Sequence, residues 1–291
     1  KFWADATYRL AVRAAQAKKN ELADELARQL VSAGCEARIM SHALYLVGQM
    51  AAASEQWPEV ILAMERLVTE YPDSSLRIPA EYWRAESHYR ESQYDEAGKL
   101  FAQLQRMTHG RTDAWLAMVP LRRAQVFAQQ SDWAQALEIA QDIKKQFPNF
   151  RQQHEVDYLV GRALASRAEF DEARAAYERV IRSPTGGRTE TAAMAQWMIG
   201  ETHFLQKKYG EAIKAYHRVE GLYAFPQWQS AALLQAGKCH EMLGQWKEAM
   251  SLYTQIIQDF QKSEYFDEAS RRLQVAEQRS EITAGRKRNQ K

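Results

Sequence analysis

One spacing constrains this chain more than any other feature: a small residue recurs every 37 to 39 positions along most of its length. An aromatic residue stands three positions before nearly every one of them, and an apolar residue stands seven positions after each. The small residues are Ala23, Val60, Ala97, Ala136, Ala173, Ala212 and Ala249. Self-similarity at a fixed period is typical of proteins in which each copy packs only against its neighbours. The sequence therefore predicts seven copies of one unit.

Each unit has the pattern of two amphipathic helices joined by a tight turn. In the sixth unit, residues 192–206 carry apolar side chains at helical spacing, and residues 211–223 place Ala212, Tyr216 and Val219 on one face. The small residue is predicted to lie where the second helix crosses the first, because a larger side chain would hold the pair apart. A Gly or Ala eight residues into each first helix serves the same close approach: Ala11, Gly48, Ala85, Ala124, Gly161, Gly200 and Gly237.

Two further positions complete the predicted packing. The apolar residue seven after the small one extends the core stripe: Leu30, Leu67, Leu104, Ile143, Val180, Val219 and Ile256. The aromatic residue three before it is expected to fill the seam between neighbouring units: Trp57, Tyr94, Trp133, Phe170, Tyr209 and Trp246. The first unit has Asn20 there instead, as an atypical end repeat would.

Asp95 and Glu96 are adjacent carboxylates that invite a metal or acid–base interpretation. The repeat argues against it, because other units lack one or both acids at the same place. We interpret the pair as a helix start, where acidic side chains meet the positive end of the helix dipole.

The pattern closely resembles the tetratricopeptide repeat. With Gly200 at the glycine of that motif, Tyr209, Ala212, Tyr216 and Val219 fall on its later signature positions. The resemblance covers about residues 4–262 and implies an all-α fold, a right-handed α-solenoid of seven helical hairpins. The expected units are 4–40, 41–77, 78–116, 117–153, 154–192, 193–229 and 230–262.

The units are longer than the usual tetratricopeptide length of about 34 residues. In this respect they are similar to the tetratricopeptide domains of bacterial cell-envelope proteins. The resemblance thus implies a periplasmic or cell-envelope location, with the cytoplasm as the alternative. The charge-poor stretch 39–54 is shorter than the ~20 apolar residues of a membrane span. The chain begins without Met, as a mature or excised fragment would. Whether further repeats or domains precede residue 1 is therefore an open question.

The end of the chain is predicted to close the array. Residues 264–280 have the pattern of a first helix without a second, which would cap the apolar face of the last hairpin. A single solenoid is thus expected over 1–284, followed by a flexible basic tail at 285–291. That tail holds four of the 39 Lys and Arg residues, so the remainder has 35 basic against 37 acidic residues. Such a body does not favour a nucleic-acid cradle.

Two glycine-containing loops, 108–115 and 184–191, lack the spacing of a phosphate-binding loop. Gly110 and Gly187 are expected to take the left-handed conformation that ends a helix. Thr112 and Thr189 are expected to cap the next helix, with Asp113 and Glu190 in its first turn.

No sequence motif points to catalysis, to a cofactor or to a metal. Cys239, His240 and Glu241 are consecutive, but consecutive helical residues point about 100° apart, and no second ligand pair supports them. Cys35 and Cys239 belong to the first and last units and are expected to be free thiols. We therefore predict a protein without enzymatic activity.

Binding has the stronger case. In tetratricopeptide proteins the first helices line the inner surface of the solenoid. The fifth position of each unit carries Tyr8, Tyr45, Tyr82, Leu121, Tyr158, Trp197 and Leu234, and the ninth carries Val12, Gln49, Glu86, Gln125, Arg162, Glu201 and Lys238. The resemblance thus implies a groove for a partner peptide or helix. Its predicted residues are Tyr45, Gln49, Tyr82, Glu86, Tyr89, Arg90, Gln125, Tyr158, Arg162, Trp197, Glu201, Phe204 and Lys238.

Several alternatives stay open at this point. The tyrosine stripe is also compatible with a packing role, because tyrosine is common at the fifth position of the repeat. The chain is also compatible with a docking arm of a larger protein, with self-association through the solenoid ends, and with an RNA-binding helical repeat. The acids at the ninth position and the slightly negative body disfavour RNA, and the lysine- and asparagine-rich clamp of chaperone-binding relatives is absent from the fifth and ninth positions.

Overall fold

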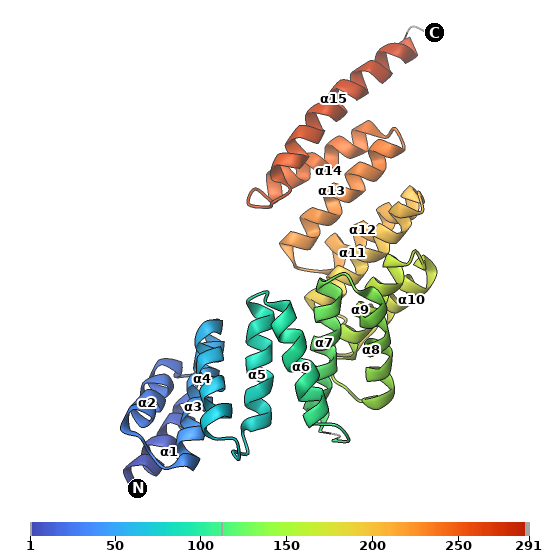
Figure 1. Ribbon diagram of the computed structural model, residues 1–291. Coiled ribbons are helices and arrows are strands. Elements are labelled where there is room, and N and C mark those ends of the chain that lie inside the picture. Colours follow the sequence, from blue (N-terminus) through green and yellow to red (C-terminus); the bar gives the residue numbers. More distant parts are fainter. Residues whose placement is uncertain (1, 112, 289–291) are drawn as a thin grey trace. The chain divides into compact units, whose positions relative to one another are not determined.

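The computed structural model describes residues 2–111 and 113–288, and all regular structure in them is helical (Figure 1). The helices follow one another as hairpins, with turns at the places where the repeat predicts them. No strand occurs among the described residues. The predicted all-α solenoid of helical hairpins is confirmed.

The chain divides into two compact units, Lys1–Ile139 and Ala140–Lys291. The first contains α1 (Phe2–Gln16), α2 (Asn20–Ala33), α3 (Ala37–Ala53), α4 (Trp57–Glu70), α5 (Arg77–Arg90), α6 (Tyr94–Met107), the 3-10 helix η1 (Ala114–Ala117) and α7 (Met118–Gln129). The second contains α9 (Gln153–Ser166), α10 (Phe170–Ile181), α11 (Glu190–Leu205), α12 (Tyr209–Leu222), α13 (Pro226–Met242), α14 (Trp246–Asp259) and α15 (Phe266–Arg288). Helix α8 (Trp133–Gln146) spans the division.

Some first helices begin earlier than the expected unit boundaries. Helix α3 begins at Ala37, α11 at Glu190 and α13 at Pro226, each a few residues before the start that the repeat register gave. For α13 the cause is visible, because Pro226 occupies the first helical turn, where its fixed φ favours the helix and its missing N–H costs nothing.

Every hairpin turn contains one residue with left-handed backbone, two positions before the start of the second helix. These residues are Lys18, Glu55, Ser92, Ser131, Ala168, Lys207 and Gly244, with φ between 57° and 69°. The N–H of the next residue donates to the carbonyl five positions back, as from Gln93 to His88 at 2.9 Å. This is the bonding of a Schellman motif, which normally favours glycine at the left-handed position. The motif could not be predicted from the sequence, because only Gly244 of these seven residues is a glycine.

The glycine eight residues into a first helix does allow a close approach, but to an aromatic ring. A Cβ at Gly200 would overlap the ring of Tyr216, and the same relation joins Gly161 with Tyr177 and Gly237 with Tyr253. These three tyrosines are fully buried. Each ring therefore lies against the first helix of its own hairpin in a space that any larger residue would fill.

The small and apolar positions of the repeat are buried as predicted. Ala23, Val60, Ala97, Ala136, Ala173, Ala212 and Ala249 are all fully inaccessible to solvent. The residues seven positions later, from Leu30 to Ile256, are inaccessible or nearly so. The repeat register therefore identified the core of each hairpin correctly.

The aromatic residue before the small one is the first residue of the second helix in six hairpins. Its seam role is seen at Trp57, whose ring lies under the Arg90 guanidinium of the following hairpin, 5.5 Å from it. Tyr94 and Tyr209 instead contact Tyr89 and Phe204 of their own hairpins, with ring centroids 5.6 Å apart. Asp95 and Glu96 lie in the first turn of α6, so the interpretation as a helix start is confirmed.

The two glycine-containing loops follow the prediction in part. Gly110 has a positive φ of 80°, as expected. Gly187 does not, and that prediction was wrong: its N–H donates to the Ser183 carbonyl at 2.8 Å, and a Cβ would meet the carbonyl oxygens of Ile181 and Ser183. Glycine is needed there for space and not for a left-handed backbone.

The predicted side-chain cap at Thr189 is wrong, and no side-chain cap is seen at the start of η1 or α11 among the described residues. Thr189 is the residue before α11, but its hydroxyl donates to the Gly186 carbonyl at 2.6 Å and does not cap the helix. Glu190 lies in the first turn as expected. Asp113 precedes η1 without a side-chain cap, and Thr112 lies outside the described residues.

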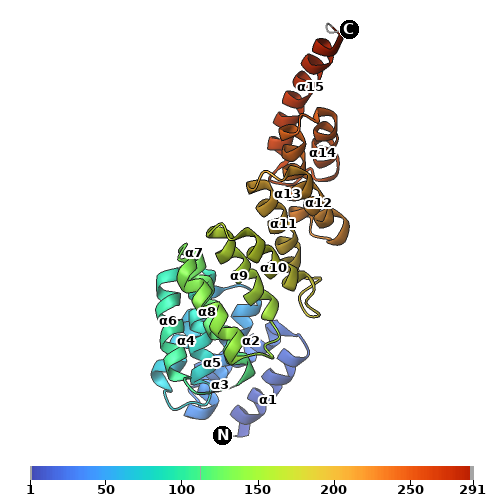
Figure 2. The same ribbon diagram turned by 90° about the vertical axis from the view of Figure 1, so that its right-hand side faces the viewer.

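Helix α15 packs against α14, beside which it lies in both views (Figures 1 and 2). Ala269 is buried in one cluster with Leu233 and Tyr253 of the last hairpin, as a capping helix requires. The helix continues to Arg288, beyond the expected end at 280. Its backbone therefore includes residues 285–288 of the segment predicted to be a flexible tail, and residues 289–291 lie outside the described part.

Candidate functional site

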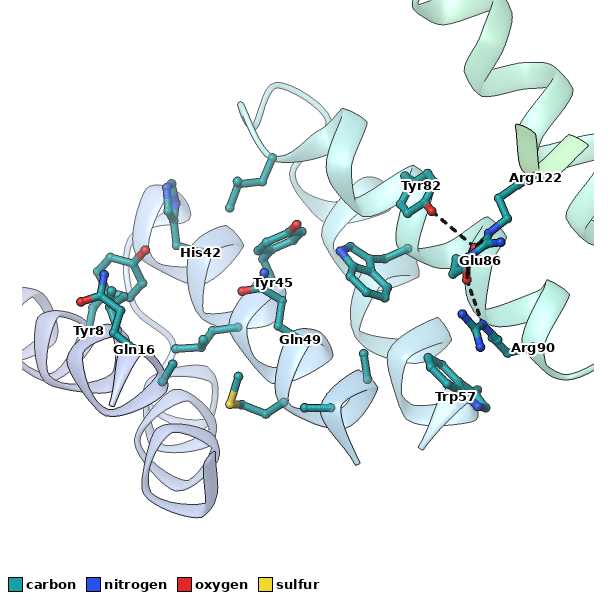
Figure 3. A pocket seen from close by; sticks show the side chains of 18 residues that line it. Tyr8, Gln16, His42, Tyr45, Gln49, Trp57, Tyr82, Glu86, Arg90 and Arg122 are labelled. Atoms are coloured by element: carbon teal, nitrogen blue, oxygen red, sulfur yellow. Dashed lines mark hydrogen bonds and ion pairs between the residues drawn. The ribbon is translucent and has the colours of Figure 1, made fainter. Parts of the chain in front are cut away.

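A pocket of about 840 Å³ lies on the first unit, over the first helices of its first three hairpins (Figure 3). Its walls come from α1, α3 and α5, with Leu76 just before α5, Trp57 from the start of α4 and Arg122 from α7. Both groove positions of the repeat register contribute in each of those hairpins: Tyr8 and Val12, Tyr45 and Gln49, Tyr82 and Glu86. The register therefore places the stripe on one shared surface within this unit.

The floor of the pocket is aromatic and apolar. Tyr82 packs edge-on against Trp83 and Trp115, with ring centroids 6.0 Å and 5.9 Å away, and Tyr8 packs edge-on against His42 at 5.5 Å. Leu46, Met50, Leu76 and several alanines complete the wall. Ring-to-ring contacts hold the tyrosines in place, so that their remaining exposed faces form a preorganised apolar surface.

One end of the pocket is charged. The Glu86 carboxylate, only 4% exposed, accepts from Arg122 at 2.6 Å and 3.0 Å and from Nε of Arg90 at 2.9 Å. Tyr82 donates a longer bond of 3.4 Å to the same carboxylate. Burial, reinforced by the nearby Glu86 charge, raises the pKa of Tyr82 to about 12, so its hydroxyl stays protonated.

Amide and imidazole groups lie away from this charged end (Figure 3). The Nδ1 atom of His42 lies 2.7 Å from the Arg38 carbonyl oxygen, which can only accept, so Nδ1 carries a proton. The side-chain amides of Gln16 and Gln49 make no hydrogen bond to any described residue. Their amides each offer a donor and an acceptor, the two groups that a peptide backbone pairs with.

Two predicted groove residues of this unit are not among the pocket-lining residues, but both contact Arg122, which is. Tyr89 lies under the Arg122 guanidinium at 5.6 Å, and Gln125 accepts from Arg122 at 2.7 Å. Sequence reasoning missed Trp83 and Arg122, which occupy the sixth position of their units. The register contained the signal, because the sixth position of one hairpin faces the ninth position of the hairpin before it.

In the second unit, the predicted groove residues have partners within that unit. Tyr158 packs with Tyr177 at 5.9 Å and with the Arg162 guanidinium, and Phe204 packs with Tyr209. Trp197 lies between Tyr216 and Trp228, 6.5 Å and 5.9 Å from their ring centroids. These contacts favour a packing role, and a binding role for the second-unit residues stays a prediction.

Charged residues at the ninth position join neighbouring elements of the array. Glu201 accepts from Tyr216 of its own hairpin at 2.5 Å and from Gln235 of the next at 2.9 Å, as Glu86 accepts from Arg122. Burial raises the pKa of Glu201 despite these hydrogen bonds, which act in the opposite direction. Lys238 pairs with Glu268 of α15 at 2.9 Å. Glu86 and Glu201 thus join neighbouring hairpins, and Lys238 joins the last hairpin to α15.

The side chains of the consecutive residues Cys239, His240 and Glu241 have different surroundings and different partners. Burial raises the pKa of the Cys239 thiol to about 12, His240 contacts Gln245, and Glu241 pairs with Tyr253 and Arg272. Among the described residues, no group of three or more His, Cys, Asp and Glu side chains is arranged to hold a metal ion. Cys35 and Cys239 are both free. Over the same residues, no helix is long and apolar enough to span a bilayer.

Repeated hairpins with a groove over their first helices define a helical-repeat protein. A model of the tetratricopeptide repeat-like domain matches residues 35–195, and a tetratricopeptide repeat model matches residues 231–263. The chain belongs to the tetratricopeptide repeat family. No curated protein matches it.

Solved structures share its fold at low sequence identity. A tetratricopeptide repeat protein from Parabacteroides merdae aligns with a TM-score of 0.67 and 10% identity, over 95% of this chain and 99% of that one. PilW, described as a type IV pilus biogenesis factor, aligns with 0.62 and 16%, over 81% and 97%. The signal-transduction ATPase PH0952 from Pyrococcus horikoshii, which has a tetratricopeptide repeat sensor, aligns with 0.71 and 13%, over 93% and 44%.

Proposed function

We propose that this chain is a non-enzymatic scaffold that binds a segment of another protein in the pocket of its first unit. The observation that carries the proposal is the shared surface formed by Tyr8, Tyr45 and Tyr82, three equivalent positions of three hairpins. A groove that runs across successive hairpins suits an extended or helical segment better than a compact small molecule.

The chemistry of the pocket supports this occupant. Held aromatic rings lose little conformational entropy on binding, and such residues dominate the energetics of protein interfaces. Gln16 and Gln49 supply unpaired amide groups for a peptide backbone, and the Glu86 end supplies charge. The site thus combines apolar contact with a small number of polar groups that fix orientation.

Affinity capture with groove variants tests the proposal. Tyr45→Ala with Gln49→Arg removes one ring and fills the centre of the pocket, whereas Leu62→Ala changes a residue of α4 that is 68% exposed and outside it. We expect the groove variant to lose the partners that the unmodified chain retains, and the Leu62 variant to keep them. Equal capture by a folded groove variant would show that the pocket is not the binding site.

The proposed setting is a bacterial cell-envelope assembly. Its supports are the long repeats and the similarity in fold to PilW, a pilus biogenesis factor. Fractionation of cells that express the complete gene tests it: envelope or periplasmic recovery is expected, and recovery only with cytoplasmic markers would contradict it.

A second candidate is a docking or sensor arm of a larger protein. The similarity to PH0952 favours it, because this chain aligns with 44% of a protein whose tetratricopeptide part is described as a sensor. The complete open reading frame decides between the two, since an arm requires a catalytic domain in the same chain.

A further inference from the structure

Two guanidinium groups converge on one carboxylate at the charged end of the pocket. Glu86 is the only acidic residue among the described residues that line the pocket, and Arg90 and Arg122 both lie against it. Both arginines are charged at any physiological pH. The charged end therefore has one positive charge more than the carboxylate neutralises.

The two arginines differ in the donors that they have left. Arg122 directs Nε and one Nη to Glu86 and its other Nη to Gln125. Arg90 uses only Nε, and its two Nη groups make no hydrogen bond to any described residue. Its side chain is 47% exposed, and its guanidinium lies over the Trp57 ring. Arg90 is thus held by Glu86 and Trp57 while two donors remain available.

We propose that the pocket selects a protein segment in which a carboxylate side chain is close to an apolar side chain. The carboxylate pairs with the free Nη groups of Arg90, whose planar fork matches its two oxygens. The apolar side chain lies on the aromatic surface of Tyr45, Trp57 and Trp83. Figure 3 shows Arg90 and Trp57 together at one end, with Tyr45 between that end and Tyr8.

Charge complementarity gives this occupant its preference over others. An acidic segment neutralises the excess positive charge, whereas a basic segment meets Arg90 without a free acid to compensate it. The inference rests on the proposed function, because it specifies the chemistry of the segment that the same pocket binds.

The test is selection from a random peptide library displayed on phage, followed by binding measurements on selected fluorescent peptides. Each peptide is also made with Asp or Glu replaced by Asn or Gln. Arg90→Gln is the test variant. Arg66→Gln is a matched control, because Arg66 on α4 is 43% exposed and its Nε also pairs at 2.9 Å with a glutamate four positions away, Glu70.

We expect the selected peptides to be enriched in an acidic residue near an apolar one. Arg90→Gln should weaken the acidic peptides about five- to tenfold and leave their amide versions nearly unchanged, since a charge-assisted hydrogen bond to a half-exposed group is lost. Arg66→Gln should leave both unchanged. Such coupling between Arg90 and the peptide acid indicates direct contact.

Two results would overturn the inference in distinguishable ways. Peptides that lose binding in the Tyr45→Ala, Gln49→Arg variant, yet show no acidic preference and bind Arg90→Gln normally, would refute the carboxylate contact and leave the groove in place. Failure to enrich any peptide that depends on the groove would refute the proposed function and the inference together.

Discussion

The hydroxyl of Tyr216, on α12, donates a 2.5 Å hydrogen bond to the Glu201 carboxylate on α11, so a fully buried tyrosine is tied to the first helix of its own hairpin. Tyr177 occupies the same position one hairpin earlier and is equally buried, but its hydroxyl has no hydrogen-bond partner among the described residues. The ninth position there is Arg162, which offers no acceptor. Two tyrosines in one structural position thus differ in a single hydrogen bond.

This difference predicts opposite costs for the same substitution. Tyr216→Phe should destabilise the protein by about 1–3 kcal/mol, because it removes a buried bond to a charged acceptor. Tyr177→Phe should be neutral or stabilise by up to ~1 kcal/mol, because it removes a buried hydroxyl that is unsatisfied. Urea unfolding followed by circular dichroism measures both. Equal losses in the two variants would show that the hydroxyls contribute alike.

The raised pKa of Glu201 predicts how its contribution to stability depends on pH. Burial makes the folded protein bind this proton more tightly than the unfolded chain does. Stability from this residue is therefore greatest below the ordinary glutamate pKa of about 4.3 and is lost as the pH rises through the higher folded value. Comparison with Glu201→Gln isolates it: the stability of the unmodified protein relative to the variant should rise on acidification from neutral pH. An unchanged difference would refute the shift.

The left-handed turn residues predict a stabilising substitution. Ala168 has φ 60°, a conformation that costs a residue with a Cβ about 1–2 kcal/mol, so Ala168→Gly should raise stability by roughly 0.5–1 kcal/mol after the entropy of glycine is counted. Gly244 has φ 69° in the equivalent turn, and Gly244→Ala should lower stability by a similar amount. Thermal unfolding measures both changes. A loss of stability in Ala168→Gly would contradict the role assigned to these turns.

The contact between Gly200 and Tyr216 predicts a steric cost. Gly200→Ala places a methyl group inside the space of a buried ring and should cost about 1–3 kcal/mol, although alanine is the better helix former. Gly221 of α12 is the control, because a Cβ added there would meet no other side chain or neighbouring helix within 4 Å, and Gly221→Ala should be neutral or stabilising. Urea unfolding distinguishes this pattern from a uniform response to alanine.

The sequence predicted the fold well because the core recurs in register. Ala212 and Val219 are buried where the repeat placed them, and the second helices begin at the aromatic residues. Residues without a repeated signal were harder. Position 187 needs glycine because a side chain would clash with nearby backbone carbonyl oxygens, and no sequence pattern predicts how that loop folds. The turn at Ala168 has a left-handed residue but no glycine that would have predicted it.

The candidate site was predicted in part for a related reason. The fifth and ninth positions gave Tyr45, Gln49 and Tyr82, because a single register places them on one surface. Arg122 was missed, since its role depends on a contact between hairpins that are 36 residues apart in sequence. The same contact shows that Glu86, predicted to face a partner, is already paired within the protein.

Photo-crosslinking from inside the pocket tests the central claim most directly. A photoreactive phenylalanine analogue at Tyr45, in the pocket, is compared with the same analogue at Leu62, which is exposed and outside it. We predict that position 45 forms a covalent adduct with one protein segment in cells that encode this chain, and that mass spectrometry maps the adduct to a sequence absent from the position 62 sample. Identical adducts at both positions, or none at position 45 while position 62 reacts, would contradict a protein-binding groove.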